Sequence, residues 1–398
     1  MKNSLRWLTS VFGAGRTPAN SPKASGLAGV RHPFARSMPG ASPDSATSGL
    51  PWGTESSNLD FLRANAVLVV FGYHVLAFFG IKRMGPFDLE AVGMFGVLSF
   101  FVHTSLVLMR SLERQVHKYG FRRLFLIFMA RRCFRIYPLS IFIVAVILLF
   151  RLPLGGHPWA LTWTSPSRWG IVSNFLLAQN ITWSNSVEGP LWSLPFEVQM
   201  YLVLPVIFLL VRKSMSVWSL VAGWVLAVGV ISIALRLGHA HPLTYVPCFL
   251  SGVIAYNSSK QVVPRWPGWW WPLFLWGLTA LLALHYGIGI AWLICLPMGL
   301  MVSRFEDIKN PWICQISYRI SKYSYGLYLS HYFCLWLAFT RLGFLTLGSQ
   351  WIIFIVTAVA LPVVLYNAIE QPSIDIGKKL VESRLAGPEM RTPARRAA

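Results

Sequence analysis

Two ionisable residues, Arg63 and His74, stand 11 positions apart in one long apolar stretch of the sequence. Eleven residues make close to three turns of an α-helix, so both side chains share a helix face, about 16 Å apart along its axis. A neutral imidazole can accept a proton from a hydroxyl or attack a thioester. If the apolar stretch spans a membrane, burying an ionisable group in it costs free energy, so such a group indicates a function. His74 is therefore a candidate base or nucleophile; the alternative is a histidine that only hydrogen-bonds a neighbouring helix.

A strongly basic segment, residues 110–135, carries eight arginines and lysines against one acidic residue, Glu113. Two of its arginines, Arg132 and Arg135, are three residues apart and face the same way on a helix. Clustered guanidinium groups bind phosphate or pyrophosphate well. A plain topology signal and a patch for anionic lipids are the alternatives, and we expect the segment to be a loop on the cytoplasmic side.

A carboxylate, Glu197, follows Pro195 closely enough to lie in the first turn of a helix, where proline is favoured. Tyr201 comes one turn later on the same face. The carboxylate could orient a histidine or bind sugar hydroxyls beside Trp192, and its alternative role is a favourable charge at a helix N-terminus.

A polar stretch inside an otherwise apolar segment, residues 324–332, is expected to line a cavity. It contains His331, a second intramembrane candidate, and His103 in another apolar segment is a third. The five cysteines form no C-x-x-C pair, and no H-E-x-x-H, G-x-S-x-G or phosphate-cradling glycine loop occurs, so we expect no metal site.

The composition of the 398-residue chain places these residues in a membrane protein. Hydrophobic residues make up 55% and charged residues only 12%, whereas about a quarter of an ordinary soluble domain is charged. The net charge of +21 is of a size that suggests nucleic acid in a soluble protein. Nothing in the sequence resembles a nucleic-acid module, so we expect the charge to record membrane topology instead.

Apolar runs divided by short breaks predict an all-α polytopic membrane protein with about ten transmembrane helices. The stretch 168–181 is interrupted by amides and is expected to be re-entrant or interfacial. The predicted spans are residues 60–81, 92–109, 136–152, 196–211, 217–237, 243–257, 269–286, 288–303, 323–343 and 350–369.

If both termini are cytoplasmic, the predicted spans place 29 lysines and arginines on the cytoplasmic side of the membrane and 6 on the outer side. This distribution follows the positive-inside rule. We therefore expect a multi-pass protein of the inner (plasma) membrane with both termini in the cytoplasm. Residues 1–57 are rich in Ser, Pro, Gly and Arg and residues 381–398 are again polar, so we predict disordered tails around a membrane domain at 58–380.

Taken in order, these segments resemble the acyltransferase-3 family of bacterial membrane O-acyltransferases. Phe61, Pro195 and Val198 depart from the family pattern, and the stretch 100–105 lacks its glycine. The matching motifs are residues 59–64 followed by His74, then residues 131–138, 192–197, 324–331 and 369–372.

The resemblance implies an enzyme that moves an acyl group from cytoplasmic acyl-CoA to a hydroxyl of a carbohydrate or lipid-linked sugar. The expected acyl group is acetyl. Arg132 and Arg135, with Arg131 as a further candidate, would bind the phosphates of the acyl-CoA. His74 would be a general base or a transient acyl acceptor, and Arg63 would hold the donor or steady the catalytic site.

The same resemblance implies that Glu197 and Trp192 face the outer side, where the acceptor enters. The alternative to an enzyme is a transporter or exporter of a sugar or lipid that uses buried histidines as a proton relay. The residues expected at the acceptor are Trp192, Ser193, Tyr201, Tyr328 and His331.

Overall fold

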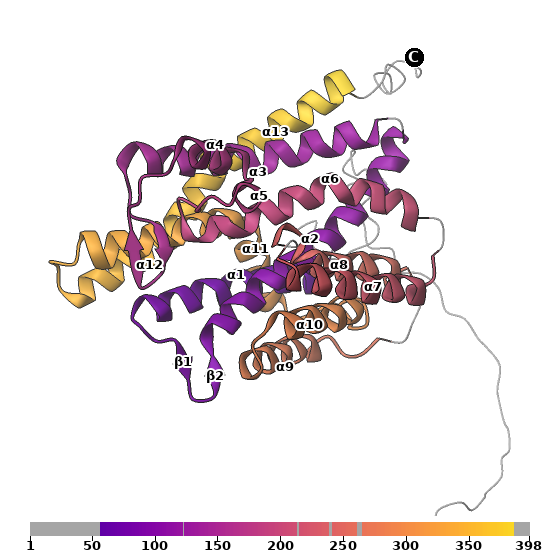
Figure 1. The fold of residues 1–398 in the computed structure, drawn as a ribbon, viewed down its shortest axis with the longest axis horizontal. Coiled ribbons are helices and arrows are strands. Elements are labelled where there is room, and N and C mark those ends of the chain that lie inside the picture. The colour runs from indigo at the N-terminus through magenta and orange to yellow at the C-terminus, as the bar shows by residue number, and fades with distance from the viewer. Residues whose placement is uncertain (1–55, 122, 213–214, 239–240, 261–264, 386–398) are drawn as a thin grey trace, which may run out of the picture. The chain divides into compact units, whose positions relative to one another are not determined.

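The computed structural model describes residues 56–121, 123–212, 215–238, 241–260 and 265–385, which are mostly helical (Figure 1). The predicted tails therefore lie largely outside the described residues. Two short hairpins interrupt the helices. They are β1 (Arg83–Met84) with β2 (Phe87–Asp88), and β3 (Gly155–His157) with β4 (Ala160–Thr162).

Among the described residues, six helical stretches are long and apolar enough to cross a membrane. Their exposed faces are apolar, as lipid contact requires: in α7 and α12, residues such as Leu226 and Val359 are two-thirds exposed. The six are α1 (Ser57–Phe78), α2 (Leu89–Tyr119), α3 (Leu124–Phe150), the pair η2 (Gly189–Ser193) and α6 (Leu194–Val211), α7 (Val217–Arg236), and a continuous run that begins with α12 (Leu347–Leu365).

The run from α12 continues without a break to Leu385. It contains two π-helical turns, η5 (Tyr366–Glu370) and η6 (Val381–Leu385), on either side of α13 (Gln371–Leu380). Four further helices of ten or more residues are α8 (Val246–Ser258), α9 (Trp270–Leu284), α10 (Ile288–Met301) and α11 (Pro311–Leu335), which η4 (Trp336–Arg341) extends.

The predicted helical class is confirmed, whereas the count of ten spans is not. Every predicted span overlaps a helix, but α8, α9 and α10 have 13, 15 and 14 residues. A bilayer core of about 30 Å needs roughly 20 residues. The stretch 168–181 forms two short helices, α4 (Arg168–Leu176) and α5 (Gln179–Thr182), which are too short to cross.

The basic segment 110–135 is not the loop that we expected, because α2 runs on to Tyr119 and α3 already begins at Leu124. Leu112 and Gln115 continue the buried face of α2 past the apolar run. The arginines end the apolar run of the sequence, but the buried positions keep the period of a helix. A prediction based on the length of the apolar run therefore ended the helix too early.

Close contacts between helices in the core depend on small residues. A β-carbon at Gly96 of α2 would meet the backbone of Ala66 in α1, and one at Gly252 of α8 would meet Ser105 and the backbone of Val102 in α2. Since lipid supplies no hydrophobic drive between helices, such close backbone packing is a main source of their association.

Two helices far apart in sequence, α1 and α11, run side by side in the same direction. The start of α1 is tied to the segment before α11, because Ser57 Oγ donates to Ile308 O (2.9 Å) and Asn58 Oδ1 accepts from Ile308 N (3.2 Å). Further along, Arg63 and then His74 of α1 each contact α11. Arg63 and His74 therefore lie on one face of α1, as predicted, and this face packs on α11.

The substitution Gly252→Ala is expected to destabilise the protein by about 1–3 kcal/mol, because the new methyl group forces α8 away from α2. Thermal unfolding in detergent measures the change as a lower Tm. Gly229→Ala on α7 is the control, since nothing lies within 4 Å of a β-carbon there. Equal Tm values for the two variants would contradict the packing described.

Candidate active site

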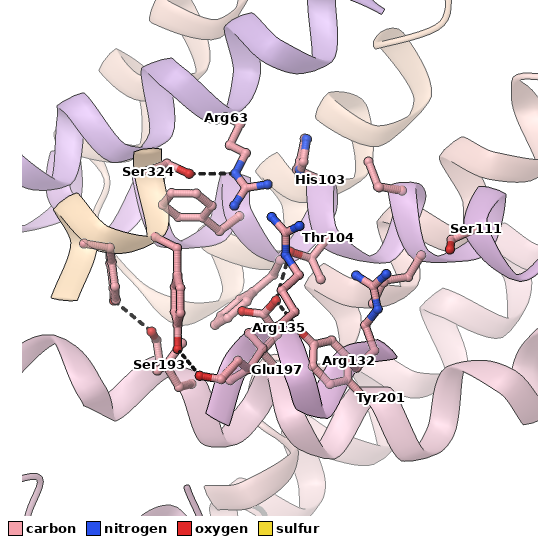
Figure 2. A pocket seen from close by; sticks show the side chains of 18 of the residues that line it. Arg63, His103, Thr104, Ser111, Arg132, Arg135, Ser193, Glu197, Tyr201 and Ser324 are labelled. Carbon is pink, nitrogen blue, oxygen red and sulfur yellow. Dashed lines mark hydrogen bonds between the residues drawn. The ribbon is translucent and has the colours of Figure 1, made fainter. Parts of the chain in front are cut away.

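A cavity of about 190 Å³ lies among α1, α2, α3, α6 and α11, and we call it the arginine cavity (Figure 2). Figure 2 shows the side chains of Arg63, Arg132 and Arg135 gathered in it with Glu197. Arg114 also contributes to the lining, so four guanidinium groups face one carboxylate. This excess of positive charge around one cavity favours an anionic ligand.

Arg132 and Arg135 of α3 both line the arginine cavity, which confirms that they share a helix face. The Nε of Arg132 is buried and has no hydrogen-bond partner within the described chain, so it is a donor available to a ligand. Their neighbour Arg131 points elsewhere, and its guanidinium donates to the hydroxyl of Tyr119 (3.0 Å). Arg131 is therefore separated from the phosphate-binding arrangement predicted for all three.

Arg63 is held at the arginine cavity by α11, because its Nε donates to Ser324 Oγ (2.8 Å). The same helix is docked on α3 where Tyr325 donates to the carbonyl oxygen of Ile136 (2.8 Å). The buried carboxylate of Glu370 lies within electrostatic range of Arg135 and Arg63. The hydrogen bond to Ser324 therefore positions the Arg63 guanidinium before any ligand arrives.

Glu197 lines the arginine cavity and is held by hydroxyl groups. Its Oε1 accepts hydrogen bonds from Tyr201 (2.6 Å), one turn later as predicted, and from Thr104 of α2 (3.4 Å). Trp192, expected beside Glu197 at the acceptor, instead lines two other cavities. The geometry therefore groups Glu197 and Tyr201 with the arginines and separates them from Trp192.

A second cavity of about 240 Å³, here called the histidine cavity, contains His74 of α1. Tyr73, Trp192 and Tyr332 are among its other lining residues. Gly189 allows the η2 turn to reach this place, because a β-carbon there would overlap the ring of Tyr332.

His331 of α11 contacts His74 directly and determines which ring nitrogen of His74 carries the proton. The Nδ1 of His331 lies 3.2 Å from the carbonyl oxygen of Leu327, which can only accept, so this nitrogen is the protonated one. In a neutral ring the Nε2 is then the acceptor, and it lies 2.9 Å from His74 Nδ1. In a neutral pair His74 therefore donates from Nδ1 and keeps its lone pair on Nε2.

The arginine and histidine cavities are neighbours that share the side chains of Val97 and Tyr328 as a wall. The Tyr328 hydroxyl donates to the carbonyl oxygen of Pro190 (3.1 Å) and lies 2.8 Å from Ser193 Oγ. Of the predicted site residues, Tyr328 and Ser193 thus lie at the junction between the two cavities.

Sequence reasoning missed the contribution of α2 to the arginine cavity. His103, a candidate without an assigned role, lines it together with Thr104, Ser111 and Arg114. Thr104 and Ser111 are seven residues apart and hence on one helix face. Their spacing could have indicated a polar face on this helix, but Ser111 lies beyond residue 109, where we expected the helix to end.

Within the described ranges, no group of three or more His, Cys, Asp or Glu side chains is arranged to hold a metal ion. The five cysteines are free thiols, and four of them are buried. They accordingly belong to the packing of the helices rather than to the two cavities.

A family model described as an acyltransferase domain, that of the acyltransferase-3 family, matches residues 56–367. Because the match covers most of the chain, the chain belongs to the acyltransferase-3 family, and with its apolar helices it is a membrane protein. Searches of curated proteins and of solved structures found no match.

Inorganic pyrophosphate is expected to bind in the arginine cavity, and Arg132→Gln should weaken its binding by about 1.5–3 kcal/mol, which is roughly tenfold to 100-fold. Arg131→Gln removes the same charge one residue earlier and should leave the affinity within about twofold, because Arg131 faces Tyr119. Isothermal titration of the purified protein measures both. An equal loss in the two variants would mean that only net charge matters.

Proposed function

We propose that this protein is an integral-membrane O-acyltransferase. It moves an acyl group, for which acetyl is the first candidate, from acyl-CoA to a hydroxyl of a carbohydrate. The observation that carries the proposal is the pair of adjoining cavities, one rich in arginine and one containing His74, with a single shared wall. Family membership supports acyl transfer in general; the donor, the acceptor and the residue roles are our inference.

The arginine cavity is the proposed donor site. Coenzyme A carries a pyrophosphate and a 3′-phosphate, and Arg132 and Arg135 offer guanidinium donors to such groups. Arg63, fixed by Ser324, lies in the same lining and would direct the donor toward the wall at Tyr328. Glu197 counters part of the positive charge in the absence of a ligand.

His74 is the proposed base for the transfer. Its Nε2 takes the proton of the acceptor hydroxyl as the hydroxyl oxygen attacks the thioester carbonyl. The carbon–sulfur bond then breaks, coenzyme A leaves as a thiolate, and the proton returns from Nε2 to the sulfur. The same nitrogen could instead accept the acyl group for a moment; in either route His331 holds the ring in the required tautomer.

Donor and acceptor are proposed to approach from opposite faces of the inner membrane, with both termini in the cytoplasm. The common direction of α1 and α11 agrees with the predicted topology, in which both run outward from the cytoplasm. The arginine cavity then lies toward the cytoplasm, where acyl-CoA is made, and the histidine cavity lies toward the outside.

His74→Ala is expected to lower the rate of acyl transfer from labelled acetyl-CoA by roughly 100-fold to 10,000-fold, the usual contribution of a general base. The assay follows transfer to surface glycans and hydrolysis by the purified protein. His157→Ala is a useful control, because this histidine lines the same cavity but sits on β3. Full activity in the His74 variant would refute the mechanism.

His331→Leu should lower kcat by roughly tenfold to 100-fold and leave the KM for acetyl-CoA unchanged, because His331 positions His74 and does not touch the donor. The pH profile of kcat should also move, since the His74 tautomer is no longer fixed. His331→Gln offers an amide oxygen to His74 Nδ1 and should restore part of the rate. A change confined to KM would show that His331 binds substrate directly.

A further inference from the structure

A third cavity adjoins the histidine cavity and has no role in the transfer described above. It has a volume of about 800 Å³, against about 240 Å³ for the histidine cavity. Met94 and Trp192 line both, so the two spaces meet across these side chains. We call it the aromatic cavity, because its lining includes Trp183, Trp192, Tyr245 and Tyr286.

We propose that the aromatic cavity binds the sugar units of a neutral glycan acceptor that lie next to the unit being acylated. This inference rests on the proposed function and specifies its acceptor. A chain of several sugars would place one unit at His74 and its neighbours beyond Trp192.

The wall nearest His74 is preformed and aromatic. The rings of Trp192, Phe196 and Tyr245 pack against one another with centroid distances of 4.9–6.1 Å. A pyranose has an apolar C–H face that packs on such rings and hydroxyls at its edge that need polar partners.

Polar partners are also present in the lining of the aromatic cavity. Gln179 is only 3% exposed, and its Nε2 donates to the carbonyl oxygen of Leu191 (3.3 Å). Its Oε1 is buried with no hydrogen-bond partner within the described chain. A sugar hydroxyl can donate to this oxygen, whereas a lipid chain would leave it unpaired at a cost. The adjacent Asn180 is fixed by a double amide contact with Gln199 (2.7 and 3.3 Å).

Trp183 has an unusual backbone that presents its ring at the mouth of the cavity. It adopts a left-handed conformation (φ 55°) at the end of α5, which is unfavourable for a bulky residue. The residue is nevertheless 70% exposed. Strain of this kind is often retained where a ligand is held, and an exposed indole is a good stacking surface for a sugar.

The charge of the lining indicates a neutral acceptor. Among the described residues that line the aromatic cavity, none is Asp, Glu, Lys or Arg. An anionic sugar would lose its hydration there without gaining a charged partner. The arginine cavity, in contrast, is built for anions.

The test uses the full-length protein in nanodiscs with labelled acetyl-CoA. The acceptors are surface glycans of the producing organism, de-O-acylated, partly hydrolysed and separated by charge and by length. We expect neutral fragments of three or more units to have KM values at least roughly tenfold below that of the single sugar, because their additional units pack on the aromatic rings; tenfold corresponds to about 1.4 kcal/mol.

Trp183→Ala should raise the KM for the long fragments by roughly tenfold, with the effect on KM rather than kcat, and Trp183→Phe should retain most of the affinity. Trp169→Ala on α4 is the matched control, because this indole is 76% exposed and does not line the cavity. A preference for anionic fragments, a KM independent of length, or equal effects at Trp169 and Trp183 would overturn the inference.

Two outcomes separate this inference from the proposed function. Hydrolysis of acetyl-CoA that depends on His74, with transfer only to a lipid extract and to no glycan fragment, would refute the glycan cavity and leave the acyltransferase chemistry intact. Absence of both transfer and hydrolysis would refute the proposed function itself.

Discussion

Charged groups can stay inside a membrane only where other protein groups or a polar cavity replace the water that hydrocarbon excludes. The arginine cavity provides such a place, and much of the packing around it serves to maintain it. Ser324 holds Arg63, Tyr325 docks α11 on α3, and small residues let α1 and α8 close on α2. The apolar outer faces of α7 and α12 complete the separation of these charges from lipid.

One helix pair, α1 and α11, joins the two cavities that we propose for the donor and the acceptor. α1 contributes Arg63 to one cavity and His74 to the other, and α11 meets them with Ser324 and His331. The proposed chemistry thus takes place along a single helix interface, while α5 and the 183–188 segment, which contribute to the lining of the aromatic cavity, would select the acceptor. In this arrangement the transfer machinery and the specificity determinants lie on different elements.

The sequence predicted the helical class, the face shared by Arg63 and His74, and the pairing of Glu197 with Tyr201, because all three follow from local periodicity. It could not predict the contact between His74 and His331, which are 257 residues apart and meet only through tertiary packing. The basic segment was predicted to be a loop for another reason. Hydropathy detects only the part of a helix that is apolar, so it does not detect the part of α2 that continues into basic residues. Arg131 was grouped with Arg132 and Arg135 because all three match the family's arginine motif, although neighbouring helical residues point in different directions.

The wall formed by Val97 and Tyr328 also has an electrical consequence. In the proposed orientation, two polar cavities enter a bilayer of about 30 Å from opposite sides, and little more than one layer of side chains lies between them. Most of the transmembrane voltage would then fall across this layer, which must remain closed to protons and ions. The Tyr328 hydroxyl donates to the carbonyl oxygen of Pro190 and lies 2.8 Å from Ser193 Oγ, and these contacts hold the layer in place. The residue past which the thioester must reach His74 would therefore also limit leakage of ions when no donor is bound.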